Sequence, residues 1–173
     1  MTNMNVDLIV ICVPGKPEPQ RRAKARAITT KSGRTMAQVY DPAVSRNWKA
    51  AARIAAAEKM QGRPVLLGPV RVSVLAQFAV PRGWPAWKQE AALAGTIKHT
   101  TRPDADNLLK PAKDALKSIV WQDDSQVVDE QALKEYSRRP ALWIKVTPLE
   151  GAPASVTSRK ALAKWIEVSP DAA

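Results

Sequence analysis

The strict alternation from Val70 to Val80 constrains the fold more than any other feature of this sequence. Every second residue there is apolar, namely Val70, Val72, Val74, Ala76, Phe78 and Val80. Successive side chains of a strand point to opposite faces, so this period of two predicts a β-strand with one buried face. A single strand is not stable alone, and the chain must therefore build a sheet around it.

Three other segments have strand character. The segment 8–13 is short and rich in β-branched residues, and it ends at the turn signal Pro14-Gly15. Two more strands are predicted over 126–136 and 141–147, joined by the turn at 137–140. The sheet should therefore contain strands from both halves of the chain.

Two main helices are predicted between these strands. The first has Asp41 as its N-cap and Pro42 at the first helical position, and it ends near Gly62. The second spans 107–118, and we expect its Pro111 in the first turn or at a slight kink, because proline inside a helix removes a hydrogen bond. The expected buried faces are Val44, Trp48, Ala51 and Ala55 for the first, and Leu108, Leu109, Ala112, Leu116 and Ile119 for the second.

The order of these elements favours one compact α+β domain, with a mixed β-sheet and the two main helices packed on it. Its expected extent is residues 1–149, with a shorter helical segment at 86–93 inside the long excursion 81–103. Residues 150–173 are rich in Ala, Ser and Pro and are expected to be a C-terminal extension, flexible or partly helical over 159–168.

Charge narrows the class of partner. The net charge is +11 and the pI is about 10.1, which favours a nucleic acid, because Lys and Arg gain affinity by releasing counterions from phosphates. The longest apolar run, 8–13, is far shorter than a membrane span, so a cytoplasmic protein without a membrane partner is expected. Cys12 is the single cysteine and His99 the single histidine, so any metal ion should be bound by oxygen.

Residues 14–40 combine turn formers with many cations and are expected to be a loop. A run with so few acids is either a solvated surface or a DNA contact, and the second is favoured. The expected DNA-binding residues are Lys16, Arg21, Arg22, Lys24, Arg26, Lys31 and Arg34.

The chemistry is expected in an acidic stretch of this basic chain. Seven of the 16 Asp and Glu residues lie between Asp104 and Glu130. Carboxylates brought together repel one another unless a hard cation such as Mg²⁺ or Mn²⁺ neutralises them. The sequence therefore predicts a site for one ion or two, and the candidate ligands are Asp104, Asp106, Asp123 and Asp124.

Several neighbours of these aspartates have two interpretations. Lys110 lies four residues after Asp106, and it either stabilises charge on a phosphate or forms an ion pair with that aspartate. Asn107 either supports a ligand carboxylate or caps the helix. Asp114 is expected to be an ion-pair partner in preference to a metal ligand, and His99 a loop residue in preference to a DNA contact. Trp84 and Trp87 either stack on unpaired bases or pack against protein.

An ordered set of motifs carries a family resemblance. It consists of P-D-x-D-N-L-x-K at 103–110, D-A-L at 114–116 and W-x-D-D-S-Q at 121–126, together with V-P-G-K-P at 13–17. The pattern resembles the RusA-type Holliday junction resolvases of bacteria and their prophages, over approximately residues 6–148.

The resemblance implies a mixed α/β fold, a homodimer and Mg²⁺-dependent paired nicking of four-way DNA junctions, with Mn²⁺ as a substitute. It places the metal-binding aspartates at Asp104, Asp106 and Asp124 and the essential lysine at Lys110, with Asp123 as an additional candidate. Lys134, in the closing strands, is expected to contact DNA.

The expected function is therefore a structure-selective endodeoxyribonuclease of DNA recombination and repair, acting in a bacterial or phage-infected cell without a small-molecule cofactor. Two alternatives stay open. One is a nuclease of the same chemistry that acts on flaps or forks, and the other is a non-catalytic basic DNA-binding protein. The acidic residues argue against the second, because a pure binder gains nothing from carboxylates that repel phosphate.

Overall fold

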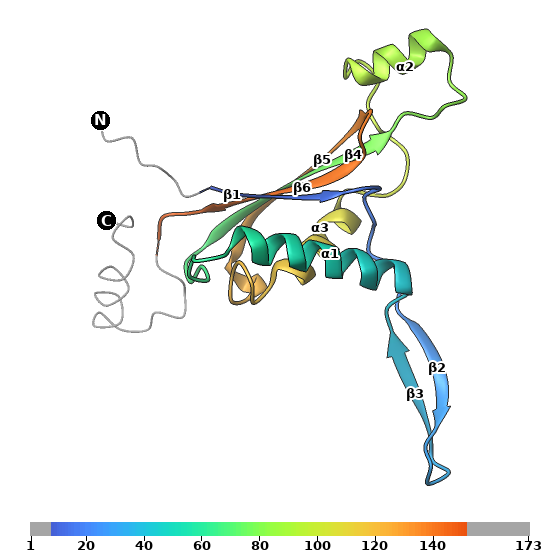
Figure 1. Cartoon of the computed structure of the whole chain (residues 1–173), viewed down its shortest axis with the longest axis vertical. Coiled ribbons are helices and arrows are strands. Elements are labelled where there is room, and N and C mark those ends of the chain that lie inside the picture. Colours follow the sequence, from blue (N-terminus) through green and yellow to red (C-terminus); the bar gives the residue numbers. More distant parts are fainter. Residues whose placement is uncertain (1–7, 152–173) are drawn as a thin grey trace.

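The computed structural model describes residues 8–151 (Figure 1). Its elements follow the chain as β1 (Ile9–Pro14), β2 (Lys24–Thr29), β3 (Thr35–Tyr40), α1 (Ala43–Lys59), β4 (Val70–Ala79), α2 (Ala86–Leu93), α3 (Asp106–Leu116), the 3₁₀ helix η1 (Asp124–Gln126), β5 (Val127–Ser137) and β6 (Ala141–Pro148). They form one α+β domain, as the sequence predicts.

The main sheet has the strand order β1-β6-β4-β5. β6 pairs antiparallel with both β1 and β4, whereas β4 and β5 run parallel. β4 has the alternating burial that its sequence predicts, with Val70, Val72, Val74, Ala76 and Phe78 buried. Because β4 and β5 are parallel, the chain must return from the end of one to the start of the other, and α2 and α3 lie in that connection.

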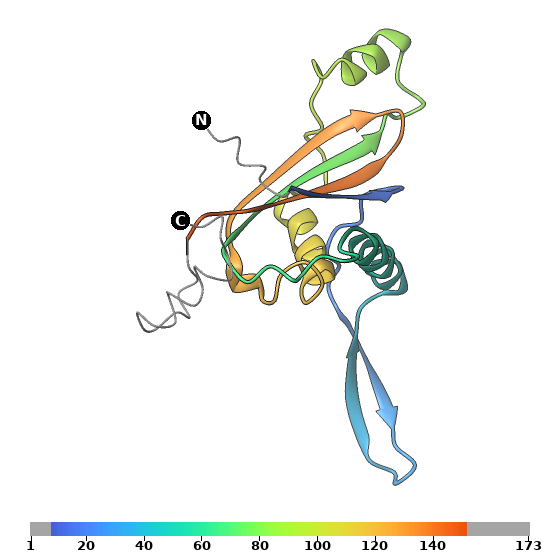
Figure 2. The same ribbon diagram turned by 60° about the vertical axis from the view of Figure 1, so that its left-hand side comes forward.

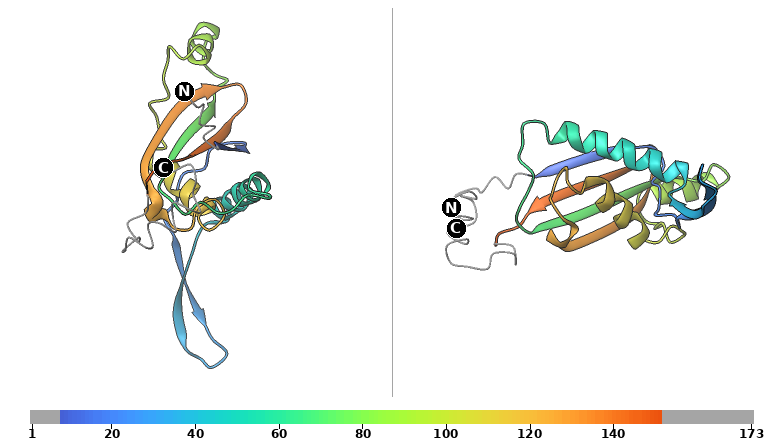
Figure 3. Two further views of the ribbon diagram at one scale, coloured as in Figure 1. Left: turned by 90° about the vertical axis from the view of Figure 1, so that its left-hand side faces the viewer. Right: turned by 90° about the horizontal axis from the view of Figure 1, so that it is seen from below.

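Helices α1 and α3 cover one face of the sheet, as the view from below shows (Figure 3). α3 buries the apolar stripe that its sequence predicts, and Leu108, Ala112 and Leu116 are fully enclosed. The neighbouring Lys110 is exposed. The apolar stripe of α3 therefore packs into the core, while the opposite side of the helix carries charged side chains at the surface.

The buried face of α1 differs from the predicted one. Trp48 is buried and Ala55 packs partly buried against the core, as expected, but Ala52 and Ala56 are the fully enclosed alanines, and Val44 and Ala51 are exposed. Buried positions four residues apart follow a ridge that is inclined to the helix axis. The contact surface of α1 therefore crosses the helix obliquely, which a stripe along one side does not describe.

The expectation of a loop over 14–40 is wrong for its second half. β2 and β3 form an antiparallel hairpin, paired from Lys24 with Tyr40 to Thr29 with Thr35. Almost every residue of the hairpin is exposed, and it projects from the body of the protein (Figures 1 and 2). With neither face buried, the strands need no alternation of apolar and polar residues, so the usual signal was absent from the sequence.

Pro111 lies inside α3 and not in its first turn. A proline at this position cannot donate to the carbonyl four residues earlier, which is that of Asn107. The backbone N–H of Gln20 donates to this Asn107 carbonyl at 2.7 Å instead. Because Pro111 leaves the Asn107 carbonyl free of its helical partner, this hydrogen bond from Gln20 can connect the segment after β1 to the first turn of α3.

The expected extension 150–173 lies outside the described residues from residue 152 onward. Within residues 8–151, no helix has the length and apolar character required to cross a membrane.

Candidate active site

Asp104 and Asp106 lie where the chain enters α3. Asp106 is the first residue of the helix, and Ala105 occupies the N-cap position with no side chain capping the helix. Both carboxylates belong to exposed residues, and neither makes a hydrogen bond or ion pair within residues 8–151. The positive end of the helix dipole stabilises negative charge at this point. The carboxylate oxygens of Asp104 and Asp106 are thus available to bind a ligand.

Lys110 follows one turn later on α3 and is exposed. The interpretation as an ion pair with Asp106 is not supported, since no ion pair of Lys110 occurs among the described residues. Asp114 does form an ion pair, but its partner is Lys49 of α1, at 2.9 Å, and not a lysine of its own helix. Lys110 therefore has an ammonium group that is free to meet a phosphate.

Lys134 of β5 fixes the loop that precedes the two aspartates. Its Nζ atom donates to the carbonyl oxygens of Thr101 and Pro103, each at 2.9 Å. A charged donor makes such bonds stronger than neutral ones. We predicted Lys134 as a DNA contact, and in the structure its contacts are with the acidic loop.

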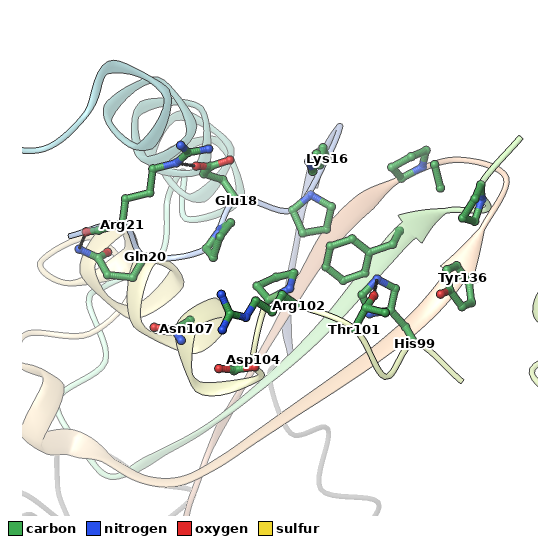
Figure 4. Close-up of a pocket in the computed structure, with 17 residues that line it drawn as sticks. Lys16, Glu18, Gln20, Arg21, His99, Thr101, Arg102, Asp104, Asn107 and Tyr136 are labelled. Atoms are coloured by element: carbon green, nitrogen blue, oxygen red, sulfur yellow. Dashed lines mark hydrogen bonds and ion pairs between the residues drawn. The ribbon is translucent and has the colours of Figure 1, made fainter. Parts of the chain in front are cut away.

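Asn107 does not cap α3, because it lies inside the helix. Its backbone carbonyl accepts from Gln20, and its side chain lines a cavity that Asp104 borders (Figure 4). The interpretation of Asn107 as a support for a ligand carboxylate stays a prediction.

That cavity has a volume of about 740 Å³ and lies between the segment after β1, the end of β4, the loop 99–104 and β5. Figure 4 places Arg102 and Asp104 at its centre, with Asn107 on one side and His99 and Tyr136 on the other. Lys16 lines it as well, so one of the predicted cations lies at the cavity. Neither Thr101 nor Arg102 belongs to a recognisable motif, so the sequence analysis could not predict them as lining residues.

The aromatic wall of the cavity centres on His99. Its ring stacks on Phe78 with centroids 4.0 Å apart and lies 5.0 Å from the ring of Tyr136. His99 lies in the loop between α2 and α3, as predicted, but only 8% of it is exposed, which the sequence did not indicate. Its Nδ1 is buried and has no hydrogen-bond partner of good geometry among the residues described. A polar atom of this kind, facing a cavity, is a candidate contact for a ligand.

Burial lowers the pKa of His99, and the positive charge of Lys134 lowers it further, while the histidine's own backbone opposes the change. A pKa lowered from the usual value of about 6.5 favours the neutral form of the ring at physiological pH. A neutral imidazole has one donor and one acceptor nitrogen, which suits the polar edge of a base.

The two tryptophans of the excursion have different surroundings. Trp84 packs edge-on against Tyr136 at 5.3 Å, and the ammonium of Lys88 lies 4.2 Å from the Trp84 ring centre. This supports protein packing for Trp84. Trp87 is 67% exposed, and a contact with DNA stays a prediction for it.

Asp123 and Asp124 lie at the opposite end of α3 from Asp104. η1 is next to the segment that leads into β4, because Gln126 donates to the carbonyl oxygens of Leu66 and Gly68, both at 2.9 Å. Lys134, which holds the loop before Asp104, is seven residues beyond Val127 on β5, or about 23 Å of strand.

The four predicted ligands therefore do not converge within one chain. Among residues 8–151, no three acidic, histidine or cysteine side chains are close enough to hold a metal ion together. The sequence order of the motifs indicated a common site, but α3 separates the two acidic pairs by its own length, about 16 Å for 11 residues.

The two aspartates of η1 differ in how their oxygens are used. Asp123 accepts from Lys117 Nζ at 2.6 Å and from the backbone N–H of Ser125 at 3.0 Å, and these contacts lower its pKa. Within residues 8–151, the carboxylate of Asp124 accepts only from Trp121 Nε1, at 3.0 Å, through one oxygen. Asp124 is thus the better candidate ligand of the two.

The remaining predicted cations are on or beside the hairpin. Lys24 and Arg26 belong to β2, and Lys31 and Arg34 lie at or near its turn. Arg26 donates to Gln38 at 2.8 Å and lies over the ring of Tyr40 at 5.5 Å. Before the hairpin, Arg21 is held in an ion pair with the buried Glu18, and Arg22 is exposed. The basic segment is thus a protruding two-stranded ribbon.

Comparisons with known proteins agree with this geometry. Residues 14–147 match the family described as Endodeoxyribonuclease RusA. The chain is also 33% identical over 145 residues to the "Uncharacterized protein YqaN" of Bacillus subtilis strain 168, an overlap that covers 82% of this chain and 96% of that protein. The family match spans the hairpin, both acidic segments, β4, β5 and all but the last residue of β6, and it meets β1 at Pro14. This chain belongs to the RusA endodeoxyribonuclease family.

Proposed function

We propose that this protein is a Mg²⁺-dependent endodeoxyribonuclease that resolves four-way DNA junctions by paired, symmetric hydrolysis of phosphodiester bonds. It acts in recombination and repair in the cytoplasm of a bacterial or phage-infected cell. Family membership supports the class of reaction and the DNA substrate. The observation that carries the choice of branched DNA is the cavity with aromatic walls beside Asp104.

The residues fit a hard divalent cation by their chemistry. Asp104, Asp106 and Asp124 all offer carboxylate oxygens that protein partners leave unused, and Mg²⁺ and Mn²⁺ prefer such ligands. Asp123 fits less well, because Lys117 and Ser125 already engage its carboxylate. When bound, the ion supplies a hydroxide nucleophile at neutral pH and stabilises charge on the attacked phosphate.

The protein's own groups supply the other parts of the reaction. Lys110 is placed one turn into α3 with no protein partner among the described residues, so its ammonium can stabilise the developing negative charge. Lys134 and the Gln20–Asn107 hydrogen bond hold the acidic loop and the first turn of α3 in place. Asn107 is placed to orient a ligand carboxylate.

The cavity explains a preference for branch points. Its volume of about 740 Å³ admits an unpaired nucleotide, and the rings of Phe78, His99 and Tyr136 offer an aromatic wall for a base. Taking a base out of a duplex costs a few kcal/mol, and this cost is smallest where the base is already unpaired. A junction, whose central bases are the easiest to unstack, should therefore present its phosphate at Asp104 more readily than a linear duplex.

The test uses purified protein, a synthetic four-way junction and linear duplex of the same arm sequence, with Mg²⁺. Cutting of the junction near its centre, at least tenfold faster than of the duplex, is the expected result. Asp104→Asn, Asp106→Asn and Asp124→Asn should abolish cutting but keep junction binding, because less negative charge faces the phosphate. Equal cutting of both substrates, or wild-type rates in the three variants, would contradict the proposal.

A second variant pair tests the role of the cavity. Ala79 is exposed and lines the cavity, so Ala79→Trp fills it without removing a core side chain. We expect this variant to lose at least tenfold in junction cutting while duplex binding is retained. Ala57→Trp, on the exposed side of α1, is the matched control and should cut normally.

Preferential cutting of flaps or forks would favour the alternative nuclease of the same chemistry. A protein that binds junctions but cuts no DNA with Mg²⁺ or Mn²⁺ would favour the basic DNA-binding protein. The limits of the domain are also a proposal: residues 1–149 make up the nuclease, and 150–173 are an extension that the chemistry does not need.

A further inference from the structure

The β2–β3 hairpin has two faces of different chemistry. Side chains alternate along each strand, and residues paired across the two strands share a face. One face, the long face, consists of the pairs Lys24 with Tyr40, Arg26 with Gln38, and Ile28 with Met36. The opposite face, the small face, consists of the pairs Ala25 with Val39, Ala27 with Ala37, and Thr29 with Thr35.

We infer that this hairpin enters the major groove of a DNA arm, with its long face turned toward the edges of the bases. The inference rests on the proposed function in one respect, that DNA is the substrate. It adds a contact with base pairs outside the cavity beside Asp104, which neither the cutting chemistry nor attraction to phosphate requires.

The dimensions of the hairpin match this groove. Neighbouring strands lie about 4.8 Å apart, so a two-stranded ribbon is narrow. The major groove of B-DNA is about 12 Å wide and admits such a ribbon, whereas the minor groove is only about 6 Å wide and must first be opened. β2 and β3 have six residues each and project from the body of the protein, so the ribbon can reach into a groove (Figures 1 and 2).

The charges of the hairpin determine which face turns toward DNA. Residues 24–40 contain four cations and no acid. Lys24 and Arg26 belong to the long face, and Lys31 and Arg34 lie at or near the turn. The small face has no charged side chain. Because phosphates line both sides of the groove, they attract the long face and the turn more strongly than the small face.

Arg26 is held in an orientation that suits contact with a base. Its Nε donates to Gln38 Oε1 at 2.8 Å, and its guanidinium carbon lies 5.5 Å from the centre of the Tyr40 ring. Within residues 8–151 its terminal amino groups make no hydrogen bond or ion pair. Arginine that donates to O6 and N7 of guanine is the commonest specific contact in the major groove. Arg26 therefore has the free donors that this contact needs.

An apolar pair lies beside Arg26 on the long face. Ile28 and Met36 are two positions nearer the turn, about 7 Å along the ribbon, and Met36 is 48% exposed. On a ribbon that met only phosphates, this pair would stay in water. The methyl group of thymine offers it an apolar partner, and only the major groove presents that methyl group. The long face can thus contact both guanine and thymine.

Chemical protection distinguishes the two grooves. Dimethyl sulfate methylates guanine at N7, in the major groove, and adenine at N3, in the minor groove. Wild-type protein bound to a four-way junction without divalent metal should protect guanine N7 at least threefold in a short stretch of an arm. Protection of adenine N3 alone, or of no base, would overturn the inference.

A matched pair of variants tests which face meets the DNA. Gln38→Glu and Ala37→Glu add the same charge at adjacent exposed positions, the first on the long face and the second on the small face. Gln38→Glu should weaken binding to linear duplex at least tenfold and remove the N7 protection, whereas Ala37→Glu should change binding less than threefold. Equal losses would mean that the hairpin has no preferred face. Neither residue belongs to the buried core, so both variants should melt with the wild type.

Replacing thymine by uracil in the protected stretch tests the apolar pair, because it removes only the methyl group. The wild type should bind the uracil duplex at least twofold more weakly than the thymine duplex. The double variant Ile28→Ser, Met36→Ser should bind the two duplexes equally. A wild type that does not distinguish them would contradict the contact with thymine.

Failure of this inference can be told apart from failure of the proposed function. Wild-type protein that cuts junctions but protects no base of the arms would reject the groove contact and keep the nuclease. Protein that protects guanine N7 in the arms but cuts no DNA with Mg²⁺ or Mn²⁺ would reject the nuclease and keep the groove contact.

Discussion

Lys110 is the residue whose interpretation the structure changes most. The expected alternative, an ion pair with Asp106, is not made among the described residues, and the side chain is exposed on α3. If its ammonium stabilises charge in the transition state, Lys110→Met should lower the single-turnover cutting rate at saturating Mg²⁺ by about 10²-fold or more. The melting temperature should stay within about 1 °C of wild type, since surface changes are usually within about 0.5 kcal/mol.

Lys113→Met is the control for this variant. Lys113 lies on the same helix but is engaged by Glu130 at 2.5 Å, so its loss should affect stability slightly and leave the cutting rate within about threefold, less than 1 kcal/mol in the barrier. If both lysine variants cut at the wild-type rate, Lys110 has no catalytic part.

His99 should make stability depend on pH. The pKa of His99 in the folded protein is lowered, first by burial and then by the positive charge of Lys134 on β5. Tyr136, which also belongs to β5, faces the His99 ring. A group with a depressed folded pKa contributes full stability above its unfolded pKa, about 6.5, and loses this contribution as the pH falls towards the folded value. The free energy of unfolding should therefore decrease as the pH is lowered from 7.5 to 5.5.

The variant His99→Phe checks the cause, because it retains a ring against Phe78 but cannot titrate. Thermal melts across this pH range should show a shallower decrease for the variant than for the wild type, whatever the difference at neutral pH. Parallel curves would mean that other groups cause the pH dependence.

At the scale of elements, the β2–β3 hairpin is unusual in having almost no buried surface. A two-stranded hairpin alone is marginally stable in water, so a partner is expected to order it. Its cations make the phosphate backbone of a DNA arm the natural partner. The hairpin should therefore contribute affinity and not the choice of branched DNA, which we propose depends on the cavity beside Asp104.

The corresponding test removes three cations of the hairpin that have no partner among the described residues, by Lys24→Gln, Lys31→Gln and Arg34→Gln. Binding to junction and duplex should weaken alike, and the slope of log K against log salt should flatten by up to about 2.7, or 0.9 per phosphate contact. The control has the same charge change on the exposed side of α1, with Arg46→Gln, Arg53→Gln and Lys59→Gln. An equal loss in the control would mean that net charge alone, and not the hairpin, governs binding.

At the scale of the whole molecule, we propose a homodimer, whose two sites are related by a two-fold axis and should make two cuts. A pseudo-symmetric junction presents two equivalent phosphates, and the dimer should nick both within one binding event. On a plasmid with an extruded cruciform, the first product should be linear DNA and not the nicked circle, and the protein should elute near twice its chain mass. Accumulation of nicked circles before linear product would contradict paired cutting.

Much of this protein follows from sequence alone. The alternation from Val70 to Val80 specifies β4, and the stripe of Leu108, Ala112 and Leu116 specifies the buried side of α3, because burial of one face imposes a period on the sequence. The ordered motifs around Asp104 and Asp124 identify the family and the class of reaction. These are local patterns, and local patterns are visible without coordinates.

Other features were decided only by the tertiary structure. The hairpin has no buried face and therefore no periodic signal, and His99 is buried by Phe78 and Tyr136, which come from distant strands. Spacing along the chain shows that Asp104 and Asp124 flank one helix, but not that they lie at opposite ends of the sheet. That separation depends on the parallel pairing of β4 with β5, a contact between residues more than 50 positions apart, which no local pattern encodes.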